Sequence, residues 1–224
     1  MSSSDRLTNP HSGEIQTEMT SVQWLITDTS PQVVIPRANA HLWQGVFTPA
    51  ASAEEADIST PAGHFCVGRL TDPPTTDYGR ACAAVDEKLI GLLSFQGIEV
   101  LVLSAEIWNN AWVPNSEGPG GFFVRDTNWR PNPGFARDEY STSDETILQL
   151  LADLPPLAWS PDFTWVVTEQ AWLMMDAGDP GFAPEEMECE PVPIEIQPGR
   201  YRVESARLHP DDAVDLHLHR LSAE

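Results

Sequence analysis

Short apolar runs separated by turn signals are the feature that most limits what this chain can fold into. The runs are three to eight residues long, and many contain β-branched or aromatic side chains. Pro, Gly, Asn and Ser residues lie between most of them, which is typical of strands joined by tight turns. Parallel strands would instead need long crossover connections. We therefore expect a mainly antiparallel sheet.

Three pairs of runs lie close enough in sequence to form β-hairpins. Residues 92–95 and 98–103 flank Gln96-Gly97, which is a suitable two-residue turn. The other two pairs are residues 24–26 with 32–35 and residues 163–168 with 171–175. Further strands are expected at residues 122–124, 201–208 and 214–221. Residues 49–61 resemble an acidic loop.

Two segments carry helix signals. Asp77 can cap a helix over residues 77–90. That helix would have one apolar stripe, formed by Tyr78, Cys82, Val85 and Leu89. A clearer signal is the capping box Thr142-x-x-Glu145, which predicts a helix over residues 143–154. The expected fold class is therefore α+β, a mainly antiparallel sheet with about two packed helices on one face.

Length and composition indicate one domain. With 224 residues and 41% hydrophobic side chains, the chain is long enough to bury a core, and we expect a single domain over residues 21–224. Residues 1–20 contain few apolar side chains and are expected to form a disordered leader. They also lack the apolar stretch of a signal peptide, and the three cysteines show no disulfide or zinc spacing. Both features favour the cytoplasm.

Negative charge is the most unusual property of the composition. The chain has 34 acidic and 12 basic residues, for a formal net charge of -22. Nucleic acid and anionic membranes are poor partners for such a chain because both would repel it, whereas a basic protein would be attracted. Acidity that only keeps the protein soluble is the alternative interpretation.

Recognisable catalytic spacings are missing from the sequence, which has no phosphate loop, serine hydrolase elbow or zinc protease motif. We therefore expect no enzymatic activity and no cofactor. One alternative is a metal-dependent hydrolase, because Asp215, His217 and His219 alternate along an expected strand and would project from one face. An ordinary half-buried strand would show the same pattern.

Two groups of residues are candidates for contacting a partner. The first is an acidic run in a Pro- and Gly-rich stretch, where we expect an exposed loop: Asp176, Asp179, Glu185, Glu186, Glu188 and Glu190. The second group consists of three tryptophans in another loop-like stretch: Trp108, Trp112 and Trp129. The alternatives are an inert solvated loop and tryptophans that fold back onto the sheet.

Several short motifs occur in one order along nearly the whole chain after the leader. They are Trp24, Pro31-x-Val-Val-Ile-Pro36, Leu42-Trp43-x-Gly45, Asp77-Tyr78-x-Arg80-Ala-Cys82, Val100-Leu-Val-Leu103, Ala111-Trp112-Val-Pro114, Gly120-Gly121-x-x-Val-Arg125, Pro198-Gly-Arg-Tyr201 and Leu218-His-Arg-Leu221. In this order they resemble the immunity-protein-21 family, whose members are predicted to neutralise toxins of bacterial polymorphic toxin systems. The chain departs from the family in a longer acidic insertion, residues 179–195, and in its long leader.

The resemblance implies a protein that is encoded beside a toxin and binds it, and it transfers no catalytic or binding residues to this chain. A protein that covers a basic active site would combine the negative charge with the missing catalytic spacings. The expected partner is therefore a basic protein toxin, with neither nucleic acid nor membrane. An acidic adaptor or a nucleic-acid mimic would bind a basic partner by the same physics.

Overall fold

The computed structural model describes residues 22–27, 30–69, 71–85, 89–104, 109–128 and 141–224. The expected leader lies outside these residues. Within the described part of the chain, strands make up 47% of the residues and helices 13%. The fold is therefore nearly all-β, and the α+β expectation is wrong. The physical reason is that both α-helices are short and each only covers a sheet.

Every strand pair in the described residues is antiparallel, and the strands form three sheets. The order in sheet A is β1 (Gln23–Ile26), β8 (Asn109–Pro114), β9 (Gly121–Asp126), β14 (Val214–Ala223), β13 (Gly199–Asp211) and β10 (Ser160–Val167). The order in sheet B is β12 (Val192–Glu195), β11 (Ala171–Asp176), β2 (Gln32–Pro36), β7 (Ile98–Leu103) and β6 (Ile90–Phe95). Sheet C is small and has the order β3 (Phe47–Pro49), β5 (Gly63–Val67) and β4 (Ile58–Thr60).

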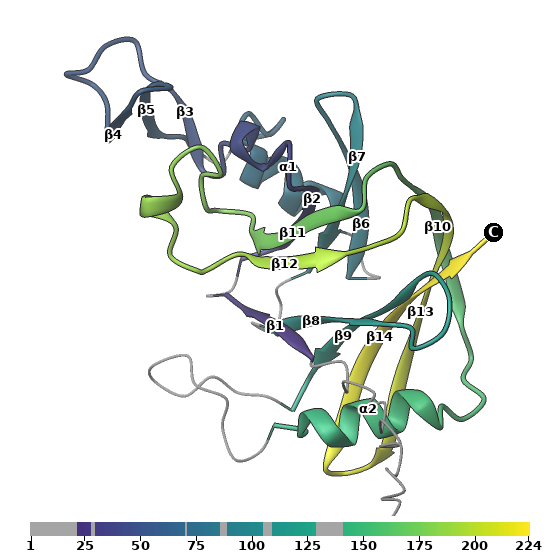
Figure 1. The fold of residues 1–224 in the computed structure, drawn as a ribbon. Helices are drawn as coiled ribbons and strands as arrows, with labels where there is room; N and C mark the ends of the chain where they lie inside the picture. The colour runs from purple at the N-terminus through teal and green to yellow at the C-terminus, as the bar shows by residue number, and fades with distance from the viewer. Residues whose placement is uncertain (1–21, 28–29, 70, 86–88, 105–108, 129–140) are drawn as a thin grey trace, which may run out of the picture.

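Sheets A and B pack face to face, with sheet A below sheet B in Figure 1. The apolar layer between them contains Val34 and Leu101 from sheet B and Phe123 and Val203 from sheet A. Because side chains alternate along a strand, Val33 points to the opposite face of sheet B, into a second apolar cluster. The continuous apolar run of β2 therefore reflects burial on both faces of the sheet.

Each outer face of this sandwich has its own helix. The outer face of sheet B is covered by α1 (Asp77–Ala84) and by the 3-10 turn η1 (Ala40–Leu42). The outer face of sheet A is covered by α2 (Asp144–Ala152), whose Ile147 lies in one apolar cluster with Leu216 and Leu218 of β14 (Figure 1). The expectation of helices on one face is wrong because two stacked sheets leave two apolar faces to cover. Among the described helices, none is long and apolar enough to span a membrane.

One expected hairpin is confirmed and two are wrong. β6 and β7 pair as expected, and Gln96 and Gly97 between them have φ values of 51° and 83°, which suit a tight hairpin turn. By contrast, β1 pairs with β8 and β2 pairs with β7 and β11. Similarly, β10 belongs to sheet A and β11 to sheet B. In both wrong cases the chain crosses from one sheet to the other, so the neighbouring strands cannot share hydrogen bonds.

The helix signalled by the capping box is confirmed, with a shift of its cap. Ser143 is the N-cap, and its hydroxyl accepts a hydrogen bond from the Thr146 N–H at 3.2 Å. The helix expected over residues 77–90 is shorter than predicted and ends at Ala84. Gly91 of β6 lies against that end, where an added Cβ would be 2.0 Å from the Ala84 carbonyl oxygen. The helix terminus therefore packs directly on sheet B, and Cys82 is exposed.

Most of the acidic loop expected over residues 49–61 is confirmed, because residues 50–57 form turns and bends between the strands β3 and β4 of sheet C. These two strands contain only three residues each. A run of three residues is too short for alternation to be recognised, so sequence periodicity could not reveal these strands.

Ile147→Ala should lower the free energy of unfolding by about 2–4 kcal/mol, because this fully buried side chain attaches α2 to sheet A and its loss leaves a cavity. Gln149→Ala, at an exposed position of the same helix, is the matched control and should cost less than about 0.5 kcal/mol. Urea unfolding followed by tryptophan fluorescence measures both. Equal losses in the two variants would contradict the packing of α2.

Candidate partner-binding surface

The acidic segment, residues 176–190, begins at the end of β11 and lies beside sheet C (Figure 1). The Gly181 N–H donates a hydrogen bond to the Trp43 carbonyl at 2.9 Å. Phe182 stacks on Phe65 of β5, with ring centroids 4.1 Å apart. The segment is therefore anchored to its neighbours rather than extending freely into solvent.

Asp176 is a buried residue at the start of this segment. It is 7% exposed and accepts hydrogen bonds from the Ser30 hydroxyl and from the Gly178 N–H, the latter at 2.7 Å. Burial raises the pKa of Asp176 to about 6, and the negative charges of Asp179 and Glu188 add to this increase. Asp176 therefore holds the turn after β11 and presents little of its side chain to solvent.

Asp179 is also buried and closes the loop. It is 5% exposed, and its two carboxylate oxygens accept hydrogen bonds from the Glu188 N–H at 3.1 Å and the Cys189 N–H at 3.2 Å. Burial raises the pKa of this carboxyl as well. The two aspartates were predicted to contact a partner, but the structure places them beneath the surface, where they connect the two ends of the loop.

The four glutamates of the segment are exposed, and so are three acidic residues of the loop between β3 and β4 of sheet C. We call this surface the acidic face: Glu54, Glu55, Asp57, Glu185, Glu186, Glu188 and Glu190. Glu185 and Glu186 lie in the 3-10 turn η2 (Pro184–Glu186). Residues 176–190 contain neither lysine nor arginine. The acidic face therefore has a strongly negative potential.

Sequence reasoning missed the part of the acidic face that comes from sheet C. Glu54 and Glu55 are one of several acidic pairs in a chain of this composition. The stacking of Phe182 on Phe65 attaches the acidic segment to sheet C, although the two are more than 100 residues apart in sequence. No local pattern could indicate this contact.

The tryptophan candidates are not part of the acidic face as far as the structure describes them. Trp112 of β8 is 2% exposed and packs against Phe123, with ring centroids 4.7 Å apart. It belongs to the apolar layer between sheets A and B, as the alternative of folded-back tryptophans predicted. Trp108 and Trp129 lie outside the described residues.

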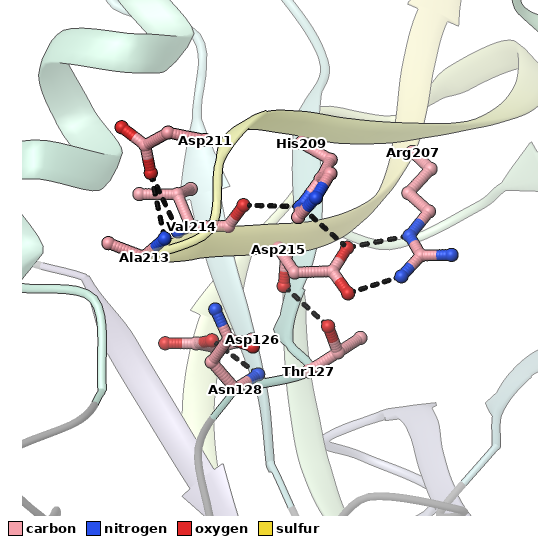
Figure 2. Close-up of polar contacts among 9 residues, drawn as sticks. All are labelled: Asp126, Thr127, Asn128, Arg207, His209, Asp211, Ala213, Val214 and Asp215. Atoms are coloured by element: carbon pink, nitrogen blue, oxygen red, sulfur yellow. Dashed lines mark hydrogen bonds and ion pairs between the residues drawn. The ribbon is translucent and has the colours of Figure 1, made fainter.

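The strand expected to carry Asp215, His217 and His219 is present, but the carboxylate of Asp215 pairs with an arginine. Figure 2 shows that both oxygens of Asp215 accept hydrogen bonds from the Arg207 guanidinium, from Nε at 2.6 Å and from Nη2. The arginine hydrogen bonds lower the pKa of Asp215 to about 2. The described residues contain no group of three or more His, Cys, Asp or Glu side chains placed to hold a metal ion. The geometry therefore does not support the hydrolase alternative.

His219 is buried and has the wrong partners for catalysis. Its Nδ1 lies 2.7 Å from the Ser205 hydroxyl, which in turn donates its single hydrogen to Asp162. Burial lowers the pKa of His219 to about 3, so the ring is neutral at pH 7 and Nδ1 must be the donor to Ser205. A histidine that donates to serine cannot accept the serine proton, as a hydrolase triad requires.

Asp176→Asn should remove a pH dependence from protein stability. The native pKa of about 6 exceeds the usual value of 3.8, so the folded state binds the proton more tightly than the unfolded state. This contribution is fully present below about pH 4 and is lost as the pH rises through about 6. The free energy of unfolding of the wild type, relative to Asp176→Asn, should therefore decrease by up to about 3 kcal/mol over this range.

Thermal unfolding from about pH 4 to pH 7 measures this difference. Glu185→Gln removes an exposed carboxylate from the same segment and is the matched control. A constant difference between the wild type and Asp176→Asn across this range would mean that the native carboxyl is not buried.

Comparison with known proteins identifies the family of the chain. A search of the curated proteins found no match, and a search of the solved structures found none either. The family model described as Immunity protein 21 matches residues 23–214, a range that contains both helices and the whole acidic face. Because this match covers most of the sequence, the chain belongs to the Immunity protein 21 family.

Proposed function

We propose that this protein binds a cognate bacterial toxin in the cytoplasm and neutralises it by covering a basic active site, without catalysis of its own. Membership of the Immunity protein 21 family supports a role in immunity to a toxin. The observation that carries the finer proposal is the acidic face, where exposed glutamates project from a segment that buried aspartates hold in place.

Fixed carboxylates favour binding in two ways. Their summed field attracts a basic surface from a distance, which accelerates association at low ionic strength. The anchored backbone also reduces the conformational entropy that binding must remove from the loop. A basic partner would in turn relieve the repulsion between neighbouring glutamates, such as Glu185 and Glu186. The same field disfavours nucleic acid and anionic membranes, which we therefore exclude as partners.

Inhibition by occlusion agrees with the contacts of the side chains that were candidates for a hydrolase site. Asp215 pairs with Arg207, and His219 is neutral and buried beside Ser205. These contacts connect the strands β13 and β14. The toxin encoded beside the gene of this protein is the partner that the proposal requires.

Replacing the four exposed glutamates of the segment by glutamine (Glu185→Gln, Glu186→Gln, Glu188→Gln and Glu190→Gln) should slow association with the toxin. We expect a decrease of the association rate constant of about tenfold at low salt, because steering scales with the charge near the interface. The decrease should shrink as the ionic strength rises toward about 0.5 M, where the Debye length becomes shorter than the distances between these charges and a partner. Surface plasmon resonance over a salt series measures both quantities.

A second quadruple variant removes the same charge from other exposed positions and serves as the control: Glu99→Gln, Glu145→Gln, Asp153→Asn and Asp212→Asn. It should slow association much less than the first variant. Equal effects of the two variants would show that net charge, and not the acidic face, steers the toxin. A wild-type protein that neither binds the toxin nor protects cells from it would refute the proposed function itself.

A further inference from the structure

A groove of about 700 Å³ lies between residues of sheets A and B. Sheet B contributes the start of β11 and the edge strand β12. Sheet A contributes Gln23 of β1, which lies close to β12, together with β8 and the loop that follows it. Apolar side chains at the bottom of the groove belong to Trp112, Trp172 and Ile194, which are all at most 3% exposed. These three side chains are packed beneath the groove and expose little apolar surface to it.

The backbone of β12 forms an open edge in this groove. β12 is the last strand of sheet B and pairs only with β11 among the described strands. The Ile196 N–H donates to the Gln170 carbonyl at 3.0 Å, so Ile196 and, by alternation, Ile194 direct their backbone groups toward β11. The N–H and carbonyl of Glu195, between them, therefore point away from β11 and pair with no other described strand. Pro193 faces the same way and offers only its carbonyl.

The rim of the groove is suited to a peptide backbone. Its side chains include four amides, which both donate and accept hydrogen bonds: Gln23, Asn115, Gln170 and Gln197. The charged residues in the lining are one arginine, Arg37, and one glutamate, Glu195, whose carboxylate accepts a hydrogen bond from Gln170 at 3.4 Å. On a chain with a net charge of -22, this lining is close to neutral.

Trp112, which lines the groove, has a hydrogen-bond donor in its indole N–H. Three other buried tryptophans donate their indole N–H to a backbone carbonyl: Trp43, Trp165 and Trp172. The Trp112 indole has no such acceptor among the described residues, although its ring lines the groove. A carbonyl of a bound chain could accept this hydrogen bond, which buried indole donors usually make.

We propose that this groove binds an extended, uncharged segment of the toxin, which adds as a short strand to the Glu195 edge of β12. The inference rests on the proposed function and names a second contact, separate from the acidic face. A second copy of this chain is disfavoured as the occupant because two molecules of charge -22 repel each other.

Glu195→Pro tests the strand pairing directly. Proline lacks an N–H and places a ring where the partner strand would lie, while the bonds between β12 and β11 do not use this N–H. We expect the dissociation constant for the toxin to increase at least about tenfold, the effect of losing a backbone hydrogen bond and adding a steric block. Glu195→Gln keeps the N–H and removes the charge, and it should bind within about threefold of the wild type. Calorimetric titration measures these values, and thermal unfolding checks that both variants fold.

Hydrogen exchange on the wild-type complex tests the same contact without a variant. Toxin binding should slow exchange of the Glu195 amide at least about tenfold, because the amide becomes hydrogen-bonded. If the wild type binds the toxin but this amide is not protected and Glu195→Pro binds normally, the groove proposal is wrong and the proposed function stands. Protection that appears with rising concentration of this protein alone would assign the groove to a second copy and also overturn the proposal. Failure of the wild type to bind the toxin would instead refute the proposed function.

Discussion

The contact between Trp165 and Trp172 connects the two large sheets, and the positions of both proposed surfaces depend on it. The two residues belong to consecutive strands of different sheets, and their rings meet edge to face with centroids 5.0 Å apart. Their indole N–H groups donate to the carbonyls of Glu99 at 3.2 Å and Glu169 at 2.7 Å. Both rings can therefore be buried without an unpaired donor. This packing holds β11, whose start lines the groove and whose end leads into the acidic segment.

The acidic segment separates structural from surface carboxylates. Asp176 and Asp179 accept hydrogen bonds from the loop backbone and stay buried, whereas Glu185 and its neighbours remain in solvent. Burial makes ionisation of the two aspartates unfavourable and raises their pKa values. Their hydrogen bonds to backbone N–H groups nevertheless hold the loop in place. A fixed array of glutamates can steer a basic partner, while a neutral groove can select a backbone segment. In this arrangement the glutamates would set the rate of association, and the groove would set which segment is bound.

The strand that contains Asp215, His217 and His219 shows what a sequence pattern can and cannot predict about a functional site. Alternation correctly indicates a strand with the three side chains on one face. It does not indicate what lies opposite that face. Here Arg207 of the neighbouring strand donates hydrogen bonds to both oxygens of Asp215 (Figure 2). The fold also buries His219, which lowers the pKa of its ring and leaves it neutral. The same three residues at an open edge of a sheet could have bound a metal ion.

The amino-acid sequence alone determined the antiparallel strands, the β6–β7 turn, the helix that begins after Ser143 and the family motifs, because each depends on residues near one another in the chain. It also determined the negative charge, which depends only on composition. The tertiary structure alone decided which strands share a sheet, since crossing between two sheets leaves no periodic signal. It also decided which carboxylates are buried and attached the acidic segment to sheet C through Phe182 and Phe65. These outcomes depend on contacts between distant segments, whose free energy comes from packing across the core and not from the local pattern of residues.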